Sequence, residues 1–209
     1  MSHYFFVLNV IILLEKRDKM SLFLGHIHYM MYNKIIFQEE ILDYLLDLSK
    51  DKENILEELD NDFPIEKGDL KNIIDENNIH GWLNDRVNRS ENRLAKAVSI
   101  LLKDFDLEEL KKRYFEFGKN YDAGNFPMEV FQFITSKFLD GMPCDHALTI
   151  IKDDEDELIF RVISDVHKEI WQKFVDPEIY WTLRDEFIKG SLVDSKLNFE
   201  NINGDYVIR

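Results

Sequence analysis

The sequence predicts an α+β fold: N-terminal helices followed by a four-stranded antiparallel sheet, made of two hairpins and packed on helices. Up to Gly141, apolar residues recur at helical spacing between charged positions, most clearly over residues 35–49. After Gly141, two short runs rich in β-branched residues flank the polar segment 152–157, which is typical of a hairpin. The last residues form a second such pair around Asn203 and Gly204, the dipeptide most typical of a tight turn.

Local signals indicate where the helices begin and end. Ser90 is expected to cap one helix, and Asp106 with Glu109 forms the D-x-x-E pattern of a capping box before the next. Pro127 suits the first position of a further helix that ends before Gly141. The other helices are expected over residues 51–62, 68–77, 165–174 and 177–190.

Length and composition indicate one globular domain, or one domain with a helical extension. The chain has 209 residues, of which 45% are hydrophobic, which is ordinary for a packed core. We expect a hydrophobic leader outside the folded domain at 1–30, a helical region at 31–105 and an α+β ligand-binding domain at 106–209. The apolar run His3–Leu14 is shorter than the roughly 20 residues of a membrane span, so we expect no membrane span and a cytoplasmic protein. A segment docked on the domain and a signal anchor are the alternatives for this leader.

The charge balance and the cysteine count exclude several classes of function. There are 26 Lys and Arg residues against 41 Asp and Glu residues, which gives a formal net charge of −15. Such a surface repels phosphate backbones and anionic lipids, so no nucleic acid partner is expected. One cysteine excludes an internal disulfide and any four-cysteine metal site. We therefore expect no metal and no cofactor.

Cys144, Asp145 and His146 form the densest cluster of reactive side chains in the sequence. A cysteine and a histidine two residues apart could act together on a substrate, with the aspartate orienting the pair. The alternative is a loop that enters the first strand, in which the cysteine packs as a small apolar residue. These three residues are the candidate catalytic group.

Aromatic residues are concentrated over residues 114–138, in the middle of the chain. They could line an apolar cavity for a small hydrophobic ligand, or they could simply fill the core. His167, near a helix start, could face such a cavity or lie at the surface. The candidate ligand-binding residues are Tyr114, Phe117, Phe131, Trp171 and His167.

The C-terminal half resembles the 4-vinyl reductase-like ligand-binding domains, a superfamily that also includes NO-signalling and Golgi-transport proteins. The resemblance is carried by a helix ending in Gly118, a hairpin over 144–162, a helix with the late glycine Gly190, and the closing hairpin 197–209. It implies their α+β fold and a ligand-sized cavity between sheet and helices. Relatives that use a metal or a thiol carry a cysteine soon after the Gly-Asp of the last hairpin, and this chain has none there.

These observations favour a small-molecule sensor or adaptor with an apolar, aromatic-lined cavity. One alternative is a small hydrolase that uses Cys144, Asp145 and His146, because the plan is also similar to that of hydrolases acting on an amino-thiazoline carboxylate. The other alternative is an interaction protein that forms a homodimer through its helices. No phosphate-binding loop or nucleophile-elbow pattern occurs in the sequence.

Overall fold

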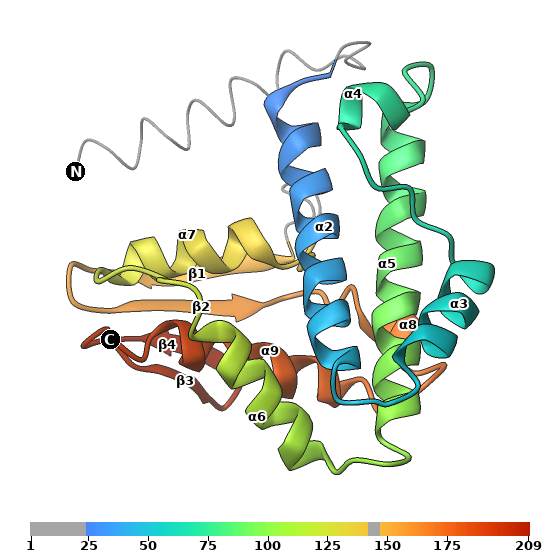
Figure 1. Ribbon diagram of the computed structural model, residues 1–209. Helices are drawn as coiled ribbons and strands as arrows, with labels where there is room; N and C mark the ends of the chain where they lie inside the picture. Colours follow the sequence, from blue (N-terminus) through green and yellow to red (C-terminus); the bar gives the residue numbers. More distant parts are fainter. Residues whose placement is uncertain (1–23, 142–146) are drawn as a thin grey trace.

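The computed structural model describes residues 24–141 and 147–209 and has the α+β arrangement that the sequence predicts (Figure 1). The described helices are α2 (His26–Leu46), α3 (Lys52–Asp62), α4 (Leu70–Ile73), α5 (Ile79–Leu101), α6 (Leu107–Gly118), α7 (Pro127–Lys137), α8 (Lys168–Trp171) and α9 (Glu178–Ser191). The strands are β1 (Leu148–Asp153), β2 (Leu158–Val162), β3 (Phe199–Ile202) and β4 (Asp205–Ile208).

The N-terminal helices form one side of the molecule and the sheet with its helices forms the other (Figure 1). The long helices α2 and α5 pack side by side, and α3 packs on α5. Helix α6 lies against α9 and also contacts α2, so that it joins the two sides. One main core of buried apolar side chains extends from α2 and α5 through α6 and α9 to the sheet.

The sheet is antiparallel, with the strand order β1-β2-β4-β3, and helices cover one of its faces. On this face, the ring of Phe160 stacks on that of Tyr206 and contacts Phe131 of α7. The guanidinium of Arg184 from α9 lies over the same Tyr206 ring. The inner face of β2 and β4 is therefore held against α7 and α9.

Both predicted hairpins are present, and the second has the expected turn. Asn203 and Gly204 both have positive φ, 55° and 91°, which is the geometry of the two-residue turn that suits the twist of antiparallel strands. Strand β3 then pairs with β4 from Phe199 opposite Ile208 to Ile202 opposite Asp205. The capping box of Asp106 and Glu109 is also confirmed, as is the position of Pro127 at the start of α7.

Several of the expected boundaries are wrong. The helices expected over 68–77 and 165–174 are each a single turn of four residues, α4 and α8. Helix α2 begins at His26, and His28 is buried, so the helical region starts before residue 31 and the end of the expected leader is part of the fold; residues 1–23 lie outside the described part. Ser90 lies inside α5 and caps nothing, because its hydroxyl bonds Gln38 and Glu39 of α2. Among the described helices, none has the length and apolar character needed to cross a bilayer.

Candidate functional site

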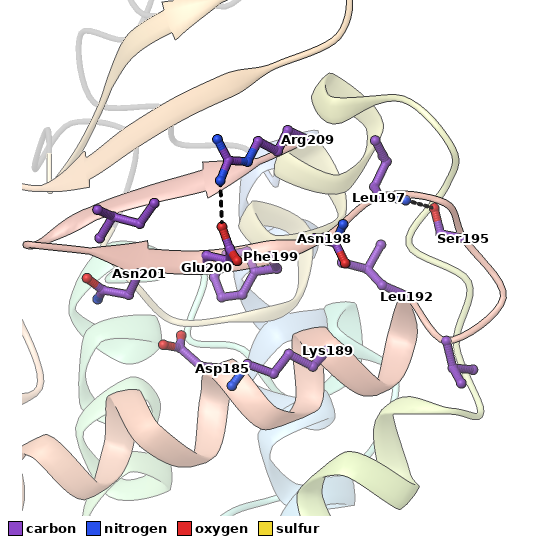
Figure 2. Close-up of a pocket in the computed structure, with 12 residues that line it drawn as sticks. Asp185, Lys189, Leu192, Ser195, Leu197, Asn198, Phe199, Glu200, Asn201 and Arg209 are labelled. Atoms are coloured by element: carbon purple, nitrogen blue, oxygen red, sulfur yellow. Dashed lines mark hydrogen bonds and ion pairs between the residues drawn. The ribbon is translucent and has the colours of Figure 1, made fainter.

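A groove of about 990 Å³ lies between helix α9 and strand β3, and we call it the α9–β3 groove (Figure 2). Asp185 and Lys189 line its helical wall, since positions four apart share one face of a helix. Its other wall is formed by β3 and the C-terminal Arg209, and residues 192–198 close one end. Side chains from two separate elements therefore face one space.

The closing segment is held in place by local bonds and by burial. The Ser195 hydroxyl donates to the carbonyl oxygen of Gly124 and accepts the N–H of Leu197 at 3.2 Å. Leu192 and Phe199, at the two ends of the segment, are buried in the main core. The segment that closes the groove is therefore held in place at both of its ends.

Charged groups of both signs line the groove. On the strand side, Arg209 Nη2 lies 3.0 Å from Glu200 Oε2, and both side chains are about half exposed. On the helix side, burial raises the pKa of Asp185 to about 6, even though the Arg184 guanidinium acts to lower it. Above this pH Asp185 is ionised, and the protein stabilises its charge less well than water does.

Strand β3 also offers backbone groups to the groove. It is last in the strand order, and Asn198 and Arg209 exchange both backbone hydrogen bonds with each other. Bonded and non-bonded pairs alternate along an antiparallel ladder. The N–H and C=O groups of Phe199 and Asn201 therefore point away from β4, toward the free edge.

A buried network of charges begins at the groove and extends into the core. Arg184, next to Asp185 in α9, donates from Nε to Asp140 at 2.8 Å. Asp140 also accepts the Tyr180 hydroxyl at 2.7 Å and lies 3.3 Å from Nε2 of His167. Nδ1 of His167 is 3.0 Å from Glu91 of α5. This network connects α5 and α9 with the segments after α7 and before α8.

His167, expected to bind ligand, is instead a structural member of this network. Its side chain is 1% exposed and both ring nitrogens face carboxylates. Its ring stacks on that of Tyr180, with 3.6 Å between the ring centroids. Burial acts to lower its pKa, but Glu91 and Asp140 outweigh burial and raise the pKa to about 9. His167 is therefore a buried cation whose nitrogens are engaged, and it has no position from which to contact a ligand in the α9–β3 groove.

The raised pKa of His167 predicts a dependence of stability on pH. The stabilisation is complete below the unfolded pKa of about 6.5 and is lost as pH rises through about 9. We expect the free energy of unfolding to fall by about 3 kcal/mol across this interval, at 1.36 kcal/mol per pKa unit. Urea denaturation at pH 6.5 and pH 9.5 measures it. His167→Gln cannot titrate and should lose this slope; an equal slope in both proteins would contradict the assignment.

The other predicted ligand-binding residues do not line the α9–β3 groove. Tyr114 and Phe117 are buried in the main core, where the Phe117 ring lies 5.9 Å from that of Phe187. Phe131 packs on Phe160, and Trp171 donates its indole N–H to Glu91 at 3.0 Å. The candidate catalytic residues Cys144, Asp145 and His146 lie outside the described residues.

A second cavity of about 480 Å³ lies among α2, α3 and α5. It contains Glu39 and Arg93, which form an ion pair of 3.0 Å with both side chains only 3% exposed. Arg93 also donates to Asp60 and to the carbonyl oxygen of Phe63. Glu39 and Arg93 are paired and almost completely buried, whereas the paired side chains of the α9–β3 groove are about half exposed, so this cavity offers a ligand less than the groove does.

Sequence reasoning missed the charged residues of the groove and the buried ion pair beside it, which are Asp185, Lys189, Glu200, Arg209, Arg184 and Asp140. One signal was present: Tyr180, Arg184 and Ile188 follow one another at intervals of four, which places an arginine on the apolar face of the helix. A charge on such a face needs a buried partner. The sequence does not indicate that Asp140 is that partner.

Comparisons with family models, with curated proteins and with solved structures found no match for this chain. In residues 24–141 and 147–209, no group of three or more His, Cys, Asp and Glu side chains is arranged to hold a metal ion.

Proposed function

We propose that the chain is a binding module and that the α9–β3 groove is its binding site. The observation that supports this most is the groove itself, which combines a volume of about 990 Å³ with charged groups of both signs on two walls. Ligand sites are typically concave spaces of about 300–1,000 Å³ in which a few polar groups fix orientation. The groove therefore suits a polar, charged ligand.

This proposal keeps the class of function expected from the sequence but changes the site and the ligand. The earlier expectation was a small hydrophobic molecule held by aromatic rings, whereas Asp185, Lys189, Glu200 and Arg209 favour a charged one. The hydrolase alternative rests on Cys144 and its neighbours, outside the described residues. The homodimer also stays a prediction.

Charge reversal at Lys189 tests the proposal. Lys189 lines the groove and its side chain is 46% exposed, so Lys189→Glu should leave the fold intact. Two charges at 4 Å interact by about 1 kcal/mol in water. Reversal replaces an attraction by a repulsion and so changes the interaction by about 2 kcal/mol, which should change the affinity for a charged ligand at least tenfold. The measurement is a thermal-shift screen of amino acids, short peptides and organic acids. A ligand at 100 times its Kd stabilises by about 2.7 kcal/mol.

The control is Lys168→Glu, which makes the same charge change at an exposed lysine of α8, outside the groove. We expect wild type and Lys168→Glu to respond alike, and Lys189→Glu to respond differently to the same compound. If no compound raises the Tm of wild type, or if all three proteins respond equally, the groove is not the binding site.

A further inference from the structure

The two edges of the sheet differ in how well they are protected. Edge strands present unpaired backbone groups, and proteins commonly protect them with bulges, lysines or prolines. Strand β1 has two of these features. Its register with β2 shifts between Ile150 and Lys152, which indicates a bulge, and Lys152 is a lysine within the strand. Strand β3 is short and contains Glu200, but it has no lysine or proline and pairs with β4 without a register shift. The edge at β3 therefore remains able to accept another strand.

The α9–β3 groove lies along the edge at β3. Phe199 and Asn201 direct backbone groups away from β4, and both residues line the groove. Helix α9 forms the opposite wall, and its residues Asp185 and Lys189 line the groove across from the strand (Figure 2). An occupant that pairs with β3 thus meets the helix with its side chains, as extended peptides do when they add to a sheet.

Among the charged groups that line the groove, Asp185 favours a basic occupant, because Lys189 is paired with Glu186 at 2.7 Å and Arg209 with Glu200 at 3.0 Å. Asp185 has a side chain that is 16% exposed, and its neighbour Arg184 lies 3.3 Å away. The same guanidinium is closer to Asp140, with Nη2 2.6 Å from its carboxylate. Asp185 therefore shares a cation that is already engaged and retains the capacity to accept a further donor. The net charge of −15 would also steer a basic partner toward the chain.

We propose that the α9–β3 groove binds an extended basic peptide segment, which adds to β3 as a further strand and places a lysine or arginine against Asp185. This inference rests on the proposed function and specifies its ligand. The peptide would exchange backbone hydrogen bonds with Phe199 and Asn201, while alternate side chains face α9.

The test starts from a displayed library of random decapeptides, from which peptides that bind the full-length protein are selected. Selected peptides are then measured by fluorescence anisotropy against wild type, Asn201→Pro and Asn201→Ala. Both substitutions remove the amide that accepts the Gly204 N–H, but only proline removes the outward backbone N–H. Because that N–H does not pair with β4, proline is compatible with the edge. Because Asn201→Ala keeps this N–H, we expect Asn201→Pro to bind the selected peptides at least tenfold more weakly than Asn201→Ala does.

A second measurement does not depend on the folding of any variant. N-methylation of alternate peptide residues removes the donors from one edge of the peptide, so methylation of one set should abolish binding and methylation of the other should not. Replacing the selected lysine or arginine by glutamine should weaken binding at least tenfold. Equal binding of all these peptides, failure to enrich any basic peptide, or dimerisation of the chain that Asn201→Pro abolishes would overturn the inference. If small charged compounds respond to Lys189→Glu while no peptide is selected, the groove remains a binding site and only the peptide inference fails.

Discussion

Asp140→Ala is expected to lower the free energy of unfolding by about 3–5 kcal/mol, the cost of breaking a buried ion pair by removing one partner. Asp140 faces Arg184, His167 and Tyr180, and the three charged side chains are at most 3% exposed. Its removal leaves two buried cations without that carboxylate and a hydroxyl without its acceptor. Urea denaturation followed by circular dichroism measures the loss.

The control for this prediction is Asp205→Ala. Asp205 pairs with an arginine too, since it accepts two hydrogen bonds from Arg161, but this pair lies on the open surface of the sheet, where the arginine is 54% exposed. Exposed pairs contribute little to stability, so we expect a much smaller loss than for Asp140→Ala. Losses of similar size for Asp140→Ala and Asp205→Ala would mean that burial does not set the strength of the Asp140 network.

The network also explains how the two sides of the molecule are joined. Glu91 belongs to α5, whereas His167, Tyr180 and Arg184 belong to the segments that surround the sheet. Burial acts to raise the pKa of Asp140, but Arg184 and His167 hold it well below its ordinary value. Asp140 therefore stays ionised at neutral pH, and the charges it orders keep Arg184 in place beside Asp185 of the groove.

The features that could be predicted from the sequence are those with short-range causes. The turn at Asn203 and Gly204 needs residues that tolerate positive φ, and the dipeptide supplies them. The capping box at Asp106 and Glu109 likewise depends on atoms three residues apart. Ser90 shows the limit of such signals, because bonds to α2 across the helix pair hold it within α5 instead.

The groove and the network could not be predicted because they depend on contacts between distant segments. His167 lies 76 residues from Glu91 and 27 from Asp140 along the chain, and no local pattern relates these positions. The position of His167 near a helix start suits either a ligand site or the surface, whereas two carboxylates from other elements surround it. The aromatic residues illustrate a related difficulty, since composition cannot distinguish rings that line a cavity from rings, such as Phe117, that pack in a core.

Helices α6 and α9 pack closely together at two glycines, Gly118 and Gly190. The Cα atoms of Gly118 and Gly190 face each other across the contact. A Cβ added at Gly118 would overlap the carbonyl oxygen of Phe187, and one added at Gly190 would overlap that of Phe115. Because these obstacles are backbone atoms within helices, no side-chain rotation can relieve them.

Gly118→Ala is therefore expected to destabilise the protein by at least about 3 kcal/mol, at the upper end of the usual cost of overpacking. The helices must separate to admit the methyl group, which also loosens the packing of Phe117 against Phe187. The matched control is Gly68→Ala, where the added Cβ would lie 3.5 Å from Ile73, an ordinary contact. We expect the control to change the free energy of unfolding by less than about 1 kcal/mol, since alanine is readily accommodated where space and φ allow. Denaturant midpoints and slopes of the three proteins provide the comparison. A Gly118→Ala protein as stable as wild type would show that α6 and α9 do not pack backbone to backbone at this crossing.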